Sequence, residues 1–121
     1  MALTKSQTVI HNDITLTAGA GDTTSTNQDL SSAYSASLRV RLTNGATGPT
    51  VPAQTKVQVS EDTTAANFIT IATITGLTSN SGVMERVIQI PSEAKYVRLV
   101  SGSNTGQNVT LRAVIDLITA Y

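Results

Sequence analysis

The side chains that could carry out chemistry are few and scattered in this sequence. The one histidine, His11, has no thiol near it, because the chain contains no cysteine. A zinc site needs three or four nitrogen, sulphur or oxygen ligands, and a hydrolytic triad would need the same imidazole. Two-residue alternation predicts that His11 faces solvent, on the side opposite Ile10 and Ile14. We therefore expect no metal site and no nucleophilic catalysis.

The carboxylates do not form a catalytic pair either. Glu61 and Asp62 are adjacent, and adjacent side chains of an extended chain point to opposite sides, which suits neither a glycosidase nor a calcium ion. Asp116 shares a predicted strand face with Arg112, and cross-strand pairing there, with Arg98 as a candidate partner, is its expected use. No glycine-rich loop leads from a strand into a helix to hold a phosphate. The sequence predicts that the protein is not an enzyme and has no cofactor.

The composition argues against several classes of partner. Eight basic residues balance eight acidic ones, and only 13% of the 121 residues are charged, against about 25% in ordinary soluble domains. No net charge draws the chain to nucleic acid or to an anionic membrane. No apolar run approaches the roughly 20 residues of a membrane helix, and the N-terminus lacks the apolar segment of a signal peptide. We expect synthesis in the cytoplasm without secretion, and a low surface charge that favours association.

Seven segments alternate between apolar and polar residues and are predicted to be strands. They are Val9–Leu16, Tyr34–Leu42, Lys56–Ser60, Phe68–Ile74, Val83–Ile90, Tyr96–Val100 and Val109–Leu117. Short strands without helices predict an all-β fold, an antiparallel β-sandwich of the jelly-roll kind. Alternation also directs Tyr34 and Phe68 toward the core. Two of the strands, Phe68–Ile74 and Val83–Ile90, are apolar on both faces, which indicates central strands or strands covered by a partner.

The N-terminal part of the chain differs from the rest. Residues 17–27 have only small or polar side chains and cannot form a core of their own. We divide the chain into an N-terminal strand with an extended polar arm, residues 1–32, and a β-sandwich core, residues 33–121. The arm either packs along its own domain or lies across neighbouring subunits.

Two stretches resemble the discoidin-type jelly roll. One runs from Val57-Gln58-Val59-Ser60-Glu61-Asp62 through Phe68-Ile69-Thr70-Ile71-Ala72, and the other is Ala94-Lys95-Tyr96-Val97-Arg98-Leu99. The resemblance covers about half of the chain, which lacks the tryptophans and the longer ligand loops of that family. It implies a jelly-roll-like sandwich and says little for sugar binding.

A broader pattern resembles small virion proteins of tailed bacteriophages. Its four segments are Leu42–Pro52, Val57–Asp62, Ile90–Leu99 and Ser103–Ala113. They cover most of the chain after Tyr34, and they imply a structural role in a virion. The size and the all-β content are similar to head decoration (cement) proteins, which sit on the capsid surface, often as trimers. The implied partners are the major capsid protein and further copies of this chain in a homotrimer.

Small and polar residues of the arm and of the loops are the expected contacts in such an interface. They are Asp22, Thr24, Asn27, Asn44, Thr47, Pro49, Asn104 and Gln107. Three-fold assembly would also bury the second apolar faces of the strands, for example at Ile69, Ile71, Val87 and Val114.

Two other functions compete with the decoration role. A carbohydrate-binding module for host adsorption would need exposed aromatic side chains, such as Tyr96 or Tyr121 near Arg98. A tail or baseplate adaptor would use the same protein contacts at a different place in the particle.

Overall fold

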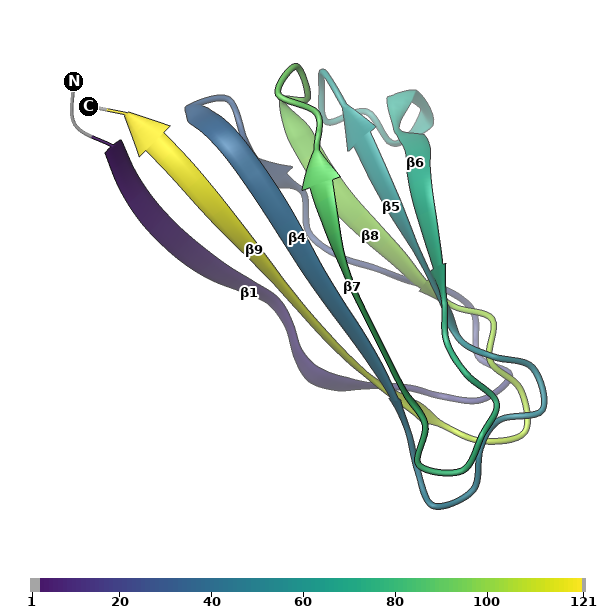
Figure 1. The fold of residues 1–121 in the computed structure, drawn as a ribbon. Helices are drawn as coiled ribbons and strands as arrows, with labels where there is room; N and C mark the ends of the chain where they lie inside the picture. The colour runs from purple at the N-terminus through teal and green to yellow at the C-terminus, as the bar shows by residue number, and fades with distance from the viewer. Residues whose placement is uncertain (1–2, 121) are drawn as a thin grey trace.

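The computed structural model describes residues 3–120, which fold into two antiparallel β-sheets packed face to face (Figure 1). The strands are β1 (Leu3–Leu16), β2 (Thr23–Thr24), β3 (Gln28–Asp29), β4 (Ala33–Asn44), β5 (Gln54–Ser60), β6 (Ile69–Thr75), β7 (Val83–Ile90), β8 (Tyr96–Gly102) and β9 (Val109–Ala120). Within that range the only helical element is a short 3-10 turn, η1 (Ala65–Asn67). All seven strands predicted from alternation are present.

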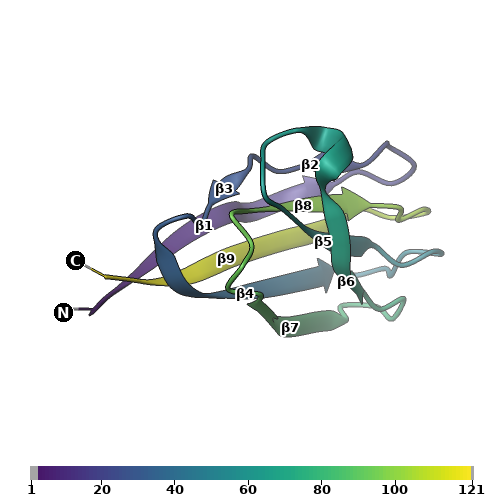
Figure 2. The same cartoon turned by 90° about the horizontal axis from the view of Figure 1, so that it is seen from above.

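One sheet has the strand order β1-β9-β4-β7, and the other has the order β2-β8-β5-β6, with β3 also paired to β8. Apart from β2–β3 and β5–β6, each connection passes from one sheet to the other, and Figure 2 shows the two layers from above. This wrapping is that of a jelly roll. The predicted all-β sandwich is confirmed.

Alternation accounts for most of the core between the sheets. Along β4 the even-numbered residues from Ala36 to Leu42 are buried, whereas the odd-numbered residues between them are not. The facing sheet contributes Val57 from β5 and Val97 and Leu99 from β8, all fully buried. Removing such side chains from water is the main contribution to the stability of the sandwich.

Two aromatic residues lie outside this core, contrary to the prediction. Tyr34 is 53% exposed, because the pairing of β4 with β9 shifts between Ala33 and Ser35 and turns Ala33 toward the core instead. Phe68 precedes β6 and is half-buried, with the Arg98 guanidinium 4.2 Å from the centre of its ring. The aromatic face is therefore covered by a cation and not by the opposite sheet.

The prediction that His11 faces solvent is also wrong. The pairing of β1 with β9 shifts between Val9 and His11 and again between His11 and Ile14. Such bulges insert a residue and reverse the side to which the next one points. His11 is only 8% exposed, its Nε2 atom makes no hydrogen bond with any described residue, and burial lowers the pKa of the imidazole.

The strands β6 and β7 are edge strands, one in each sheet, and not central ones. Apolar residues of both strands remain exposed, with Ile69 of β6 at 68% and Val87 of β7 at 62%. Val114, by contrast, is 6% exposed within the single chain, so this member of the predicted interface needs no partner to bury it. For the exposed residues of β6 and β7, cover by a partner is the explanation that the sequence leaves.

The polar segment after β1 lies along its own domain. Thr23 of β2 pairs with Ser101 of β8, and Gln28 of β3 pairs with Val97 of the same strand. Leu30 is buried in the core, which fixes the segment between β3 and β4. The first two residues of the predicted N-terminal part (1–32) and the last residue of the predicted core (33–121), residue 121, lie outside the described residues. None of the helical structure in residues 3–120 is long and apolar enough to cross a membrane.

Candidate protein interface

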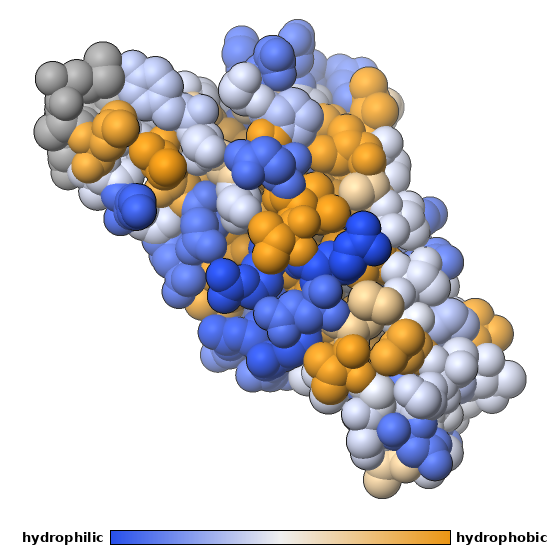
Figure 3. All heavy atoms as spheres, in the orientation of Figure 1, coloured by the Kyte–Doolittle hydropathy of each residue, from blue (hydrophilic) through white to orange (hydrophobic). Residues whose placement is uncertain are grey.

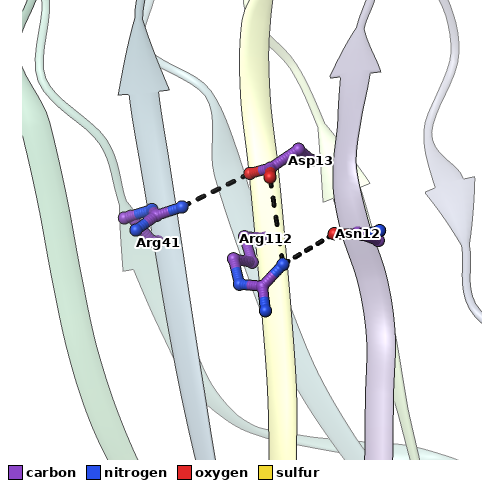
Figure 4. Close-up of polar contacts among 4 residues, drawn as sticks. All are labelled: Asn12, Asp13, Arg41 and Arg112. Atoms are coloured by element: carbon purple, nitrogen blue, oxygen red, sulfur yellow. Dashed lines mark hydrogen bonds and ion pairs between the residues drawn. The ribbon is translucent and has the colours of Figure 1, made fainter.

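The outer face of the β1-β9-β4-β7 sheet carries most of the charged side chains that come together. Cross-strand register places Arg41 of β4 between Arg112 of β9 and Glu85 of β7. The bulge in β1 brings Asp13 to the same row, where its Oδ1 atom lies 3.3 Å from Arg41 Nη2 and its Oδ2 atom 3.8 Å from Arg112 Nη1 (Figure 4). Arg112 Nη1 also donates a hydrogen bond of 2.6 Å to Asn12 Oδ1. One carboxylate thus holds two arginines across three strands.

This charged row orders the surface more than it stabilises the fold. The side chains of Arg41 and Asp13 are 41% and 52% exposed, and exposed ion pairs contribute about 0–1 kcal/mol each. A second polar row lies further toward the N-terminal end of β1, and in it Gln7 Nε2 donates a 3.1 Å hydrogen bond to Asp116 Oδ1. Arg98 lies on the other sheet and donates to Gln58 Oε1 at 2.8 Å. The expectation that Arg98 pairs with Asp116 is therefore wrong.

Between these two rows the same face is largely apolar. Val9, Val114 and Val87 follow one another across β1, β9, β4 and β7, with Arg39 of β4 between Val114 and Val87. A hollow of about 200 Å³ over this region is lined by both kinds of side chain, including Arg39, Glu85 and Val114. Figure 3 shows hydrophilic residues gathered over β9 and β4, with hydrophobic patches along β7.

Four loops meet at one end of the sandwich, and we call this surface the loop end; it comprises residues 17–22, 45–53, 76–82 and 103–108 (Figure 1). Hydrogen bonds join each loop to a neighbour. They run from Gly48 N to Asn80 Oδ1 (2.9 Å), from Ser81 N to the Gly45 carbonyl (2.7 Å), from Thr50 N to the Thr105 carbonyl (2.8 Å) and from Gly19 N to the Asn104 carbonyl (2.9 Å). The loop end is therefore held in one arrangement before any partner binds.

Three of the eight predicted contact residues are buried at the loop end. Asn44 Nδ2 donates to the carbonyls of Leu77 (2.8 Å) and Ser79 (2.9 Å), and Asn104 Nδ2 donates to those of Leu16 (2.9 Å) and Gln107 (2.9 Å). Pro49 is buried as well. These residues shape the loops from inside, and their side chains do not form the outer surface.

The other five predicted contact residues are exposed, at two places. Asp22, Thr47 and Gln107 lie on the loop end. Thr24 and Asn27 lie along the outer edge of the second sheet, in and after β2. The structure thus brings together three of the eight on one accessible surface.

Asp13 is the residue that the sequence analysis missed. Its φ of 52° is in the left-handed region, which Asn and Asp tolerate better than other non-glycine residues. The dipeptide Asn12-Asp13 inside a predicted strand was the available signal, because these residue types mark turns and bulges.

A second concavity lies at the opposite end from the loops. It measures about 440 Å³ and is lined by apolar residues, including Val59 and Ile69, and by the acidic residues Glu61, Asp62 and Glu93. Hydrogen bonds from the Asn67 side chain and the Thr64 amide hold the pKa of Asp62 below its ordinary value. Among residues 3–120 no three His, Asp or Glu side chains are grouped closely enough to hold a metal ion.

No protein-family model matches this chain, and no curated protein matches its sequence. Solved structures share its fold. The K3 cleaved adhesin domain of Lys-gingipain from Porphyromonas gingivalis W83 is 14% identical, with a TM-score of 0.60 over 91% of this chain and 71% of that one. The SPBc2 prophage-derived protein YomS is 12% identical, with a TM-score of 0.52 over 98% of this chain and 96% of YomS.

A third similar structure is VP2 of infectious bursal disease virus, solved as a subviral particle. It is 13% identical, with a TM-score of 0.56 over 97% of this chain. The match spans 32% of the VP2 chain, so this protein corresponds to about a third of it. At these identities the three likenesses establish a common β-rich fold, one that also occurs in viral and prophage proteins.

Proposed function

We propose that this chain is a structural protein of a tailed-phage virion, a decoration protein that binds the major capsid protein on the outer surface of the head. Its role is mechanical and not catalytic. The observation that carries the proposal is the loop end, a polar surface held rigid by hydrogen bonds between four loops. A surface that is ordered in advance loses little conformational entropy on binding.

The fold and the sequence support the same role. YomS, a prophage-derived protein, matches over nearly the full length of both chains, and VP2 of the subviral particle contains the same sandwich. The four segments that resemble small phage virion proteins include two that build the loop end, Leu42–Pro52 and Ser103–Ala113. Many copies on a lattice need only weak single contacts, because multivalent attachment multiplies their effect.

The test is a heat challenge of phage particles assembled with and without this protein. Particles that lack it are expected to release DNA at a lower temperature, and purified protein added back is expected to restore the resistance. The double variant Thr47→Arg/Gln107→Arg places two bulky cations on the loop end and is expected not to restore it. The variant Ser6→Arg, whose substitution lies at the opposite end of the molecule, is the matched control. Equal breakage with and without the protein would contradict the proposal.

The two competing functions have less support in the structure. Phe68 has the Arg98 guanidinium over its ring and Tyr96 is half-buried, so neither offers a free aromatic face; Tyr121 lies outside the described residues. A tail or baseplate adaptor would use the same surfaces. Labelling the chain in intact particles and locating it by electron microscopy separates head from tail.

A further inference from the structure

One flank of the sandwich is formed by two open strand edges, and we call it the β6/β7 flank. The strands β6 and β7 are the last strands of their sheets, and they lie beside each other on the same side of the molecule (Figures 1 and 2). Soluble proteins usually protect such edges with charges, prolines, bulges or a covering segment, because unpaired backbone groups attract further strands. From Ile69 to Thr75 the edge strand β6 has no charged residue and no proline, and one bulge near Ile71 is its protection. The edge strand β7 carries two charged residues, Glu85 and Arg86, so it can pair only in a register that keeps like charges from facing each other directly.

Apolar side chains accompany these open edges. Ile69 is 68% exposed and Ile71 is 38% exposed on β6, while Val83 is 50% and Val87 is 62% exposed on β7. β-branched residues such as these favour strand pairing and gain from burial. The flank therefore combines unpaired backbone with the side chains that stabilise a neighbouring strand.

We propose that the β6/β7 flank binds a second copy of this chain, through antiparallel pairing of β7 with β7 of that copy about a two-fold axis next to Val87. The pairing would join the two β1-β9-β4-β7 sheets into one continuous sheet. A two-fold contact of this kind is self-complementary, because each copy offers the same surface. The proposal is independent of the virion role, since it concerns only copies of this chain.

The charges of β7 select the register. The two-fold axis stands perpendicular to the sheet, so residues of the outer face meet residues of the outer face. An axis at Glu85 would set two carboxylates opposite each other, and an axis at Arg86 would set two guanidinium groups opposite each other, both of which are unfavourable. An axis at Val87 pairs Val87 with itself and Glu85 with Gln89 of the second copy. It also uses residues 84–90, nearly all of β7 (Val83–Ile90), whereas an axis further along the strand would pair fewer residues.

The same arrangement accounts for the apolar row on the outer face. Val87 lies next to Arg39 of β4, which lies next to Val114 of β9. Pairing at Val87 extends this row into the second copy and buries the valine that protrudes most. On the inner side it brings the uncharged β6 edges toward each other.

One electrostatic repulsion, between the two copies of Arg86, remains in this register and makes the dimer affinity depend on salt. Arg86 of one copy is a diagonal neighbour of Arg86 of the other, at the roughly 7–8 Å typical of such positions. Both guanidinium groups are exposed, so dissolved salt screens their repulsion. The dimer is therefore expected to become tighter as the salt concentration rises.

The first experiment measures the mass in solution by sedimentation equilibrium over a range of concentrations. The 12.6 kDa chain is expected to form a dimer of twice that mass. Val87→Lys is expected to give monomers, because two ammonium groups would face each other, and circular dichroism checks that the fold is kept. Val9→Lys changes an exposed valine of the same face at the opposite edge of the sheet and is expected to leave the dimer intact. A monomeric or trimeric wild type, a dimeric Val87→Lys variant, or a dimer loosened by salt would overturn the proposal.

The second experiment tests the register by cross-linking, which the absence of cysteine from this chain makes clean. In the proposed pair the two Val87 residues are directly opposite, with Cα atoms about 4.5–5.5 Å apart, within reach of a disulfide. Val87→Cys is expected to form a covalent dimer on mild oxidation. Gln89→Cys lies on the same face of the same strand, but its copy is four residues away along the pair and beyond disulfide reach. Equal cross-linking of the two variants would refute this register.

Discussion

Asn104→Ala is the perturbation that tests most directly how the loop end is held. Asn104 is 1% exposed, and its Nδ2 atom donates two hydrogen bonds, one to the Leu16 carbonyl at the end of β1 and one to the Gln107 carbonyl within its own loop. It therefore ties the end of β1 to the loop of residues 103–108. Alanine keeps the backbone and removes both donors.

The expected magnitude follows from these two bonds. Each contributes about 0.5–1.5 kcal/mol net, so their loss should cost roughly 1–3 kcal/mol of unfolding free energy. The Asn104 Oδ1 atom accepts no hydrogen bond from any described residue, so its removal lowers the cost and places the expected value near 2 kcal/mol, about a thirtyfold change in the folded-to-unfolded ratio. Asn104→Asp should cost more, because a buried carboxylate would face two carbonyl oxygens.

Urea denaturation of wild type and variants measures the change in free energy, and amide hydrogen exchange locates it. The amide of Gly19, which donates to the Asn104 carbonyl, is expected to exchange faster in Asn104→Ala. The control is Asn108→Ala, in the same loop, where the exposed Asn108 Oδ1 accepts one bond from the Ala18 amide and the expected loss is below about 1 kcal/mol. A cost for Asn104→Ala no greater than that of Asn108→Ala would refute the reasoning.

Two further predictions concern the bulge in β1 and the packing of the loops. Burial lowers the pKa of His11 below its ordinary value of 6.5, so the unfolded chain binds the proton more readily than the folded one. The free energy of unfolding should therefore fall as the pH drops through 6.5 and below. His11→Leu should flatten this pH dependence in urea titrations, and an unchanged slope would contradict the burial argument. At Gly48 an added Cβ atom would overlap the Thr78 carbonyl, whereas at Gly45 it would meet nothing within 4 Å, so thermal denaturation should show Gly48→Ala to be destabilised by about 1–3 kcal/mol and Gly45→Ala to be nearly unchanged.

Alternation located the strands because their period is a local property of the sequence. The even-numbered residues of β4 from Ala36 to Leu42 could be assigned to the core with no knowledge of their neighbours. The two-residue strands β2 and β3 could not be located in this way, because Thr23–Thr24 and Gln28–Asp29 contain no apolar residue and therefore no alternation. Their pairing depends on the edge that β8 offers them, which is a property of the whole fold.

Bulges explain the errors at His11 and Tyr34. Each irregularity shifts the parity of a strand by one residue, so alternation fails locally, whereas Ile14 and Leu16, beyond the second shift in β1, are again on the core side as predicted. Neither position is marked by glycine or proline, and the Asn12-Asp13 dipeptide after His11 is the weaker signal of an interruption that the sequence does contain. The same effect concealed Asp13, whose ion pairs with Arg41 and Arg112 exist only because the bulge in β1 brings it over β9.

The candidate contact residues were partly predictable for a similar reason. Loop composition indicated where the chain turns, and Thr47 and Gln107 do lie on an exposed surface there. It could not separate them from Asn44 and Asn104, because an asparagine that faces a partner and one that caps a loop from inside look the same in a sequence. The distinction depends on the carbonyl groups that the fold places within reach of each amide.

The proposed dimer contact at the β6/β7 flank determines how the two loop ends of a dimer are oriented. Antiparallel pairing at Val87 reverses the strand direction from one copy to the next, so the two loop ends of a dimer point in opposite directions along the joined sheet. Because the loop end lies at the tips of the strands and the β6/β7 flank lies along their sides, occupying one leaves the other free. Under both proposals, a dimer that binds the capsid through its two loop ends would contact two different capsid subunits. Such a dimer would join neighbouring subunits, as the proposed decoration role requires, whereas a single copy with one loop end would attach to one of them.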